Sequence, residues 1–97
     1  ARFSDIAVER ATLHIRVRNV ETRVSRMQFE LFVYLAEHRQ RWVHSDEIIA
    51  FVSGAHHHPK TSLVRVQVCA LRKALRTERA CIRSNGNKSY MLTLAAS

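Results

Sequence analysis

KTSLVRVQVCALRKALR, residues 60–76, carries an aliphatic stripe and a basic stripe at helical spacing. Four aliphatic residues recur at i, i+4, i+7 and i+11 and therefore share one side of an α-helix: Val64, Val68, Leu71 and Leu75. About a quarter turn away, at ~100° per residue, the same spacing places a second set: Arg65, Cys69, Arg72 and Arg76. We predict a helix over 60–76 that buries its aliphatic side and presents its arginines to water or to a polyanion.

The charge of the chain is concentrated in the same region. The formal net charge is +8 and the isoelectric point is about 10.8. Residues 60–97 contribute +7 of this, from eight Lys and Arg against Glu78 alone, whereas residues 1–59 contribute +1. An excess this one-sided favours a nucleic-acid footprint over an ordinary solvated face. Because the major groove of DNA admits one helix between walls of phosphate, helix 60–76 is the candidate recognition helix.

Length and composition predict one globular domain over residues 1–97. The sequence contains no run of ~18 apolar residues and no apolar leader, so we expect a cytoplasmic protein. An anionic membrane surface is the weaker interpretation of the charge, because the basic helix has no Trp or Phe. Two cysteines are too few for a disulfide framework, so reduced thiols are expected. A redox switch at Cys69, beside the arginines, is the alternative.

The N-terminal residues 5–24 read as a small antiparallel sheet. In TLHIRVR, Leu13, Ile15 and Val17 point one way and the polar residues between them point the other, which is typical of a half-buried strand. Shorter strands are expected over residues 6–8 and 22–24. The turns between them are expected near Arg10 and Asn19.

Two helices are expected before the basic one. The first, 26–39, starts from a capping box in which Ser25 and Gln28 satisfy each other's backbone donors, and it is apolar on most of its circumference. Trp42 and Val43 are then predicted to return to the core, Trp42 by packing and not by stacking on a base. The second helix, 45–53, has acids in its first turn and an apolar face made by Ile48, Ile49, Phe51 and Val52.

The linker GAHHHP contains three consecutive histidines, His56, His57 and His58. Consecutive side chains point in different directions, whereas a metal site needs side chains that converge, so no metal is expected. Gly54 is expected to end the second helix, and Pro59 to lie in the first turn of the third.

The chain is predicted to end in a basic β-hairpin over residues 80–94. ACIRS and SYMLTL read as strands, and the NGNK turn between them contains residues that tolerate positive φ. Arg83 and Lys88 flank its tip. A basic hairpin directly after a basic helix is a wing, so the fold class is α+β: a winged helix-turn-helix with an N-terminal sheet and three helices.

These segments resemble the OmpR/PhoB-type effector domains of bacterial two-component response regulators across nearly the whole chain. The family pattern LTxxEFxLLxxL is matched in the first helix by Val24, Ser25, Gln28, Phe29, Leu31, Phe32 and Leu35. VSREQL corresponds to residues 43–48, and VDVxIxxLRxxL to residues 64–75, where Leu71, Arg72, Lys73 and Leu75 agree. GxGYxL corresponds to residues 87–92, where Tyr90 and Leu92 agree. The chain departs from the family at Ala70 and Gly86, where many members have arginines.

The resemblance implies a groove-facing edge different from the basic stripe. By family position the edge is Leu63, Val66, Gln67, Ala70 and Lys73; by charge it is Arg65, Arg72 and Arg76. We favour a docking in which Arg72, Lys73 and Arg76 hold phosphates and Gln67 reads a base, while the apolar residues contact thymine methyls or a partner. The full candidate set also includes the helix start and the wing: Ser62, Leu63, Arg65, Val66, Gln67, Cys69, Ala70, Arg72, Lys73, Arg76, Arg83, Ser84, Asn87 and Lys88.

The expected function is sequence-specific binding of double-stranded DNA for transcription regulation, with the third helix in the major groove and the wing on the adjacent groove. The resemblance implies tandem or homodimeric binding and contact with RNA polymerase through residues 53–59. The alternative is a degenerate winged helix that binds a protein partner and touches nucleic acid non-specifically. The sequence has no Gly-rich phosphate loop, nucleophile elbow or HExxH motif, so neither an enzyme nor a cofactor is expected.

Overall fold

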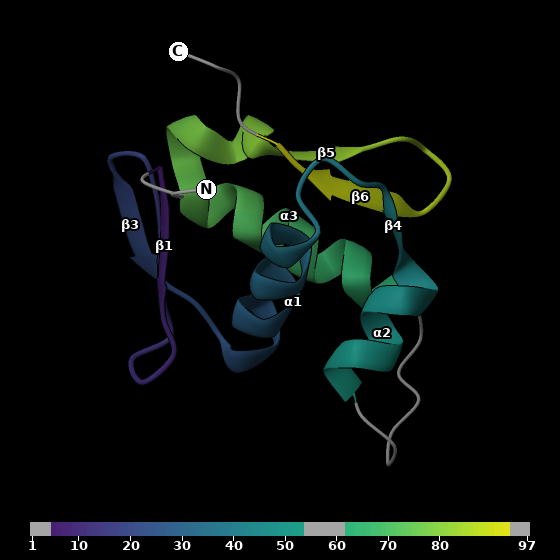
Figure 1. Cartoon of the computed structure of the whole chain (residues 1–97), viewed down its shortest axis with the longest axis horizontal. Helices are drawn as coiled ribbons and strands as arrows, with labels where there is room; N and C mark the ends of the chain where they lie inside the picture. Colours follow the sequence, from purple (N-terminus) through teal and green to yellow (C-terminus); the bar gives the residue numbers. More distant parts are fainter. Residues whose placement is uncertain (1–4, 54–61, 94–97) are drawn as a thin grey trace.

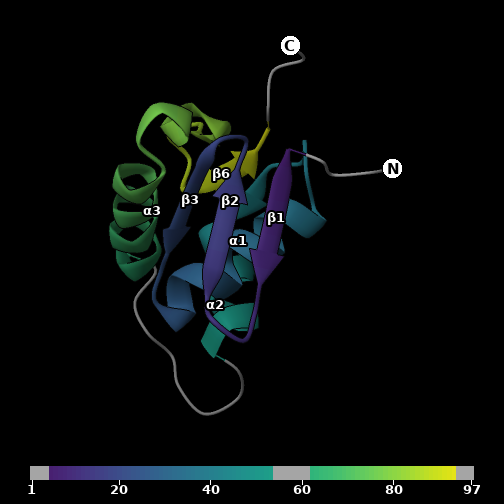
Figure 2. The same ribbon diagram turned by 90° about the vertical axis from the view of Figure 1, so that its left-hand side faces the viewer.

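The computed structural model describes residues 5–53 and 62–93. An N-terminal sheet of three antiparallel strands has the order β1 (Ile6–Glu9), β2 (His14–Val17) and β3 (Val20–Arg23). Its strands lie side by side in front of helix α1 (Arg26–Glu37), as Figure 2 shows. Ile15 and Val17 are buried beneath it, as the alternation in TLHIRVR predicts. The expected turns form at both positions, and β3 begins two residues earlier than predicted.

Helix α1 is the central element of the core. The predicted capping box is present: the Gln28 backbone N–H donates to Ser25 Oγ at 3.2 Å, and the Ser25 N–H donates to Gln28 Oε1 at 3.1 Å. Five of its side chains are buried, which confirms the mostly apolar circumference: Phe29, Leu31, Phe32, Val33 and Leu35. Figure 1 shows α1 between the N-terminal sheet on one side and α2 (Ser45–Ser53) on the other. The helix ends at Glu37, two residues before the predicted end.

The prediction that Trp42 packs in the core is wrong, because its side chain is 39% exposed. Val43 does enter the core, in the short strand β4 (Val43–His44), a strand that the sequence analysis did not predict. Adjacent residues of an extended chain point to opposite sides, so burying Val43 directs Trp42 to solvent. Phe51, predicted on the buried face of α2, is also 45% exposed, and its ring packs against Tyr34 with centroids 4.5 Å apart.

The C-terminal part contains α3 (Ser62–Leu75), a 3-10 helix η1 (Arg76–Cys81), and the hairpin strands β5 (Ile82–Ser84) and β6 (Ser89–Leu92). Helix α3 buries its predicted stripe of Val64, Val68, Leu71 and Leu75. Arg76 has φ +52, and this left-handed residue ends the helix one position earlier than predicted. Ala80 and Cys81 belong to η1, so the hairpin is shorter than the predicted 80–94.

The hairpin is the outer part of a second three-stranded sheet, with the order β4-β6-β5. Val43 pairs with Tyr90 and His44 with Ser89, so the strand before α2 holds the inner strand of the hairpin. At the tip, Gly86 has φ +82, and the Asn87 N–H donates to Asn85 Oδ1 at 2.8 Å. The sheet, three helices and C-terminal hairpin confirm the predicted winged-helix fold. The predictions for Gly54, the histidines and Pro59 lie outside the described residues.

Candidate nucleic-acid interface

Helix α3 lies at the surface beside β3 and under the C-terminal hairpin, as Figures 1 and 2 show. Because the aliphatic stripe of α3 is buried, the helical period determines which residues lie on its opposite, outward face. The exposed residues of this outward face draw on both candidate edges of the sequence analysis: Ser62, Arg65, Val66, Cys69 and Lys73, with Arg76 just after the helix. The exposed face of α3 therefore lies between the two predicted edges.

The other candidates of α3 lie on its flanks. Gln67 is half-buried and its Oε1 accepts a hydrogen bond of 3.0 Å from Gln28 Nε2, on the side of α1. Arg72 is half-buried on the opposite flank and donates to the carbonyl oxygen of Ile82. Leu63 and Ala70 are half-buried as well. The structure thus places two of the four polar residues of the favoured docking, Gln67 and Arg72, at the edges of the outward face and in contact with the chain itself.

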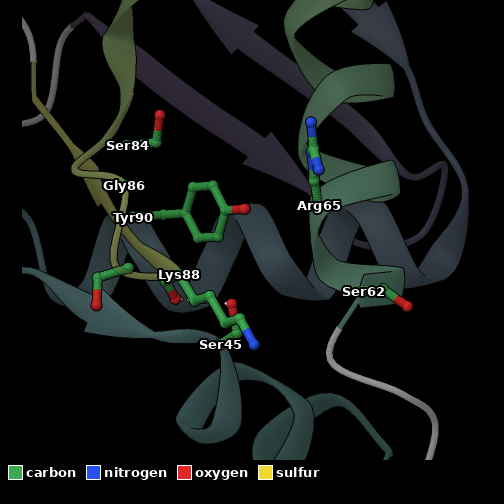
Figure 3. Close-up of a pocket in the computed structure, with 8 residues that line it drawn as sticks. Ser45, Ser62, Arg65, Ser84, Gly86, Lys88 and Tyr90 are labelled. Atoms are coloured by element: carbon green, nitrogen blue, oxygen red, sulfur yellow. Dashed lines mark hydrogen bonds between the residues drawn. The ribbon is translucent and has the colours of Figure 1, made fainter.

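The four wing candidates, Arg83, Ser84, Asn87 and Lys88, are all exposed. A hollow of about 410 Å³ separates the wing from the first half of α3. Figure 3 shows the Tyr90 ring reaching from the hairpin toward α3, where Arg65 stands on the opposite wall. The hollow is lined mainly by hydroxyl and basic groups: Ser45, Ser62, Arg65, Ser84, Gly86, Lys88, Ser89 and Tyr90.

Four of these lining residues were absent from the predicted site: Ser45, Gly86, Ser89 and Tyr90. Ser45, Ser89 and Tyr90 enter the hollow because β4 and β6 pair, which brings the start of α2 against the hairpin. Tyr90 had a detectable signal, since it matches the family motif at the end of the hairpin. Ser45 and Ser89 had none, because ordinary serines become site residues here only through strand pairing across more than forty residues of sequence.

The electrostatics separate the interface from the rest of the molecule. Three acids of the N-terminal half, Asp5, Glu30 and Glu47, pair with arginines of that half, as Arg41 does with Glu47 at 2.7 Å and Arg39 with Asp5 at 3.6 Å. Glu78 is the only acid among residues 60–97, and it lies 3.8 Å from Arg18 on the N-terminal sheet. On α3, just after it and on the wing, five exposed basic side chains make no ion pair within the described residues: Arg65, Lys73, Arg76, Arg83 and Lys88. Within the same residues, Arg23 of β3 and Arg79 of η1 make none either.

The two cysteines lie in different environments. Cys69 is exposed on the outward face of α3, whereas Cys81 is buried at the end of η1. Burial raises the pKa of the Cys81 thiol to about 11, and the nearby Glu78 carboxylate adds to this. Cys81 is therefore a protonated, apolar-packed thiol at neutral pH. Within the described ranges no cluster of three potential metal ligands occurs, and none of the helices is long and apolar enough to cross a membrane.

A match to a known protein family covers most of the chain. The family model described as "Transcriptional regulatory protein, C terminal" matches residues 8–92. The chain belongs to this family. It is the OmpR/PhoB type of effector domain, a family of transcriptional regulators and not of enzymes. A search of curated proteins found no match.

Solved structures of OmpR/PhoB-type domains share the fold of this chain. The DNA-binding domain of Escherichia coli CadC has a TM-score of 0.80 at 19% identity, over 97% of this chain and 91% of that one. The RstA DNA-binding domain of Klebsiella pneumoniae, solved in complex with the RstA box, has a TM-score of 0.74 at 21% identity, over 95% and 94%. The response regulator DrrB of Thermotoga maritima gives 0.76 at 17% identity, over 96% of this chain but only 43% of that one.

Proposed function

We propose that this OmpR/PhoB-type domain binds double-stranded DNA sequence-specifically in transcription regulation, as one winged-helix domain over residues 1–97. One observation carries the proposal: within the described residues, five exposed basic side chains without an ion-pair partner lie on the outward face of α3, just after it and on the wing. A folded protein gains nothing from crowding like charges, which repel each other. A duplex compensates them, because its backbone carries one negative charge per ~1.7 Å of helix axis.

The geometry supports a docking with α3 in the major groove and the wing on the adjacent groove. In this arrangement Arg65, Lys73 and Arg76 contact phosphates beside α3, and Arg83 and Lys88 contact phosphates beside the wing. In this docking, the hydroxyl groups that line the hollow between α3 and the wing face the DNA backbone. Val66, Cys69 and Ser62 face the base edges, and Gln67 reaches them only by exchanging its hydrogen bond with Gln28.

We further propose that the domain binds DNA in tandem or as a homodimer, because a domain of this size covers only a short site. The proposed contact with RNA polymerase falls on residues 53–59, of which 54–59 lie outside the described residues. A cytoplasmic location follows from the proposed function, since the DNA of a bacterium lies in its cytoplasm.

The test is a selection and titration. A duplex is selected from a randomised pool, and its affinity and that of an unselected duplex are measured over a series of salt concentrations. The logarithm of affinity against the logarithm of salt should fall with a slope of about −0.9 per phosphate contacted, and the selected duplex should bind at least tenfold more tightly. A flat slope would refute DNA binding. A steep slope with equal affinity for both duplexes would support the alternative, a degenerate winged helix with non-specific binding.

A matched pair of variants tests where on the molecule the DNA-binding interface lies. Lys88→Ala should make the slope less steep by about 0.9. Arg10→Ala is the control, because Arg10 is a basic residue that is ion-paired to Glu30 in the N-terminal half. Equal effects of the two variants would show that the binding is a general response to net charge.

A further inference from the structure

Arg72 differs from the other basic residues of the interface in that its guanidinium binds the chain itself. Its Nε and Nη2 groups donate to the backbone carbonyl oxygen of Ile82 at 3.0 and 2.8 Å. The side chain is half-buried, and Ile82 is 2% exposed. Arg72 lies in the last turn of α3, and Ile82 is the first residue of β5. These two hydrogen bonds therefore tie the reading helix to the root of the wing.

The contact has the properties of a geometric constraint. Both donors belong to one planar group, so a single acceptor fixes the direction of the guanidinium as well as its distance. A hydrogen bond from a charged donor is roughly twice as strong as one between neutral groups. Lysine has one compact ammonium on a flexible stem and lacks this planar fork. The chemistry at this position therefore requires arginine for its shape in addition to its charge.

The outer part of the wing is held from another direction. The backbone N–H and the Oγ of Ser45 both donate to the carbonyl oxygen of Lys88, at 2.8 and 2.7 Å. Ser45 is only 2% exposed at the start of α2. The hairpin is thus fixed near its tip by α2 and at its root by α3, and its inner strand pairs with β4.

We propose that Arg72 is a positioning residue of the DNA interface, which sets the placement of the wing relative to α3 and neutralises no phosphate. The proposal rests on the proposed function and replaces the role in phosphate binding that the sequence predicts for Arg72. It divides the basic residues into two classes. Arg65, Lys73, Arg76, Arg83 and Lys88 supply charge to the duplex, whereas Arg72 supplies the alignment that lets wing and helix reach the backbone together.

Salt dependence separates the two roles. Arg72→Ala should weaken binding to the selected duplex by about three- to tenfold at fixed salt, the range expected for a lost hydrogen-bond constraint. The slope of log affinity against log salt should change by less than half of the ~0.9 expected for a lost phosphate contact. Lys73→Ala is the matched control, since Lys73 is the next residue, exposed and without an ion pair within the described residues. The slope measured for this variant should become less steep by about 0.9. Circular dichroism checks that each variant is folded, and Arg72→Gln replaces the alanine variant if that one is not.

Arg72→Lys gives the sharpest contrast, because it keeps the charge and removes the fork. Under our proposal this variant binds as weakly as Arg72→Ala. A phosphate contact would instead be largely kept by lysine. The proposal is overturned if Arg72→Lys binds like the parent, or if Arg72→Ala lowers the slope as much as Lys73→Ala does.

A double-mutant cycle tests whether Arg72 acts through the wing. If it does, Lys88→Ala should cost less in an Arg72→Ala background than in the parent, because the wing is already misplaced. If Arg72 and Lys88 instead made independent phosphate contacts, the fold losses of affinity in the two single variants would multiply in the double variant. Purely multiplicative losses would count against the proposal.

Hydrogen exchange of the free protein gives a readout that does not depend on DNA. In Arg72→Ala the amides of the hairpin, including the Thr93 N–H that donates to Cys81, should exchange faster, while the amides of α1 keep the parent rate. Unchanged exchange in the hairpin would overturn the proposal. If the parent chain bound no duplex at all, the proposed function would fail, and the exchange result would still report on the link between Arg72 and the wing.

Discussion

Val66 is 59% exposed on the outward face of α3, between basic side chains. An isopropyl group in that position gains nothing from folding, but it can pack on the one apolar group of the major groove, the methyl of thymine. Val66→Ala should therefore weaken binding to a selected duplex that contains thymine by about three- to tenfold. Titration of duplexes in which single thymines are replaced by uracil, which lacks the methyl, identifies the contacted base.

The same duplexes supply the control for this prediction. Uracil at the contacted position should weaken the parent and leave Val66→Ala unaffected. Val8→Ala, which removes an exposed valine of β1 on the N-terminal sheet, should bind like the parent. If no uracil substitution distinguishes the parent from Val66→Ala, then Val66 makes no contact with a thymine methyl.

Glu47 connects a second group of residues, on the side of α1 and α2. It accepts hydrogen bonds from Arg41 at 2.7 Å and from the Tyr34 hydroxyl. The Arg41 hydrogen bond, followed by that of Tyr34, holds the pKa of the Glu47 carboxyl below its ordinary value of 4.5. The hydrogen bond to Glu47 raises the pKa of the Tyr34 hydroxyl. Both shifts favour the ionised carboxylate beside the neutral phenol in the folded chain.

The sign of the pH effect follows from these directions. A carboxyl group whose pKa is lower in the folded state stabilises the fold above pH 4.5, and this contribution is lost as the pH falls through the folded pKa. The difference in unfolding free energy between the parent and Glu47→Gln should therefore be largest near neutral pH and shrink below pH ~4.5. Urea denaturation at pH 7 and pH 3 measures it. Because the Glu47 side chain is 36% exposed and its charge is screened by solvent, the difference should also shrink in high salt. A difference that grows on acidification would contradict the assigned network.

At the scale of elements, the hairpin depends on contacts that it does not itself contain. Ser45 Oγ donates to the Lys88 carbonyl oxygen at 2.7 Å and is almost fully buried. Ser45→Ala should lower the unfolding free energy by about 0.5–1.5 kcal/mol, the net contribution of a typical hydrogen bond. Ser84→Ala is the matched control, an exposed serine of β5, and should change it by less than about 0.5 kcal/mol. Chemical denaturation measures both, and equal values for the two variants would contradict the anchoring role of Ser45.

The elements also show what the sequence can and cannot predict. Helix α3 follows from a local signal, because four aliphatic residues at helical spacing can be buried together only on one side of a helix. The capping box of α1 and the alternation of β2 are equally local. Strand β4 has two residues, and its existence depends on pairing with β6, so no pattern within residues 40–44 predicts it. The exposure of Trp42 follows from that missed strand.

The site divides in the same way. The charge of the last third and the stripe on α3 predict the proposed interface from sequence, because both depend on residue type and spacing alone. The hollow between α3 and the wing depends on how two distant segments approach each other, so Ser45 and Ser89 were missed. Arg72 was placed on the DNA-facing stripe because the helical period puts it near Arg65 and Arg76. Its hydrogen bonds to Ile82 depend on the path of the chain through η1, which the period does not contain.

At the scale of the whole molecule, the net charge of +8 makes salt act on the free and bound domain with opposite signs. In the free domain the unpaired basic residues of α3 and the wing repel each other, and salt screens that repulsion. Raising sodium chloride from 50 to 200 mM should therefore raise the melting temperature of the free chain, by about 2–4 °C for each ~0.5 kcal/mol of repulsion removed. In the complex the duplex already compensates these charges, and salt competes with it. If five phosphates are contacted, the same change lowers affinity by about 500-fold, or roughly 4 kcal/mol of stabilisation by the ligand.

Thermal unfolding with and without an excess of the selected duplex tests this difference in sign. As the salt concentration rises, the melting temperature of the free chain should rise and that of the complex should fall, so the two should converge. Arg65→Ala/Lys88→Ala should reduce both salt effects, because it removes two basic residues that contribute to each. A free chain destabilised by chloride at these concentrations would mean that its basic residues are compensated within the fold. The positive charge on α3 and the wing would then no longer support the proposal that this surface binds a polyanion.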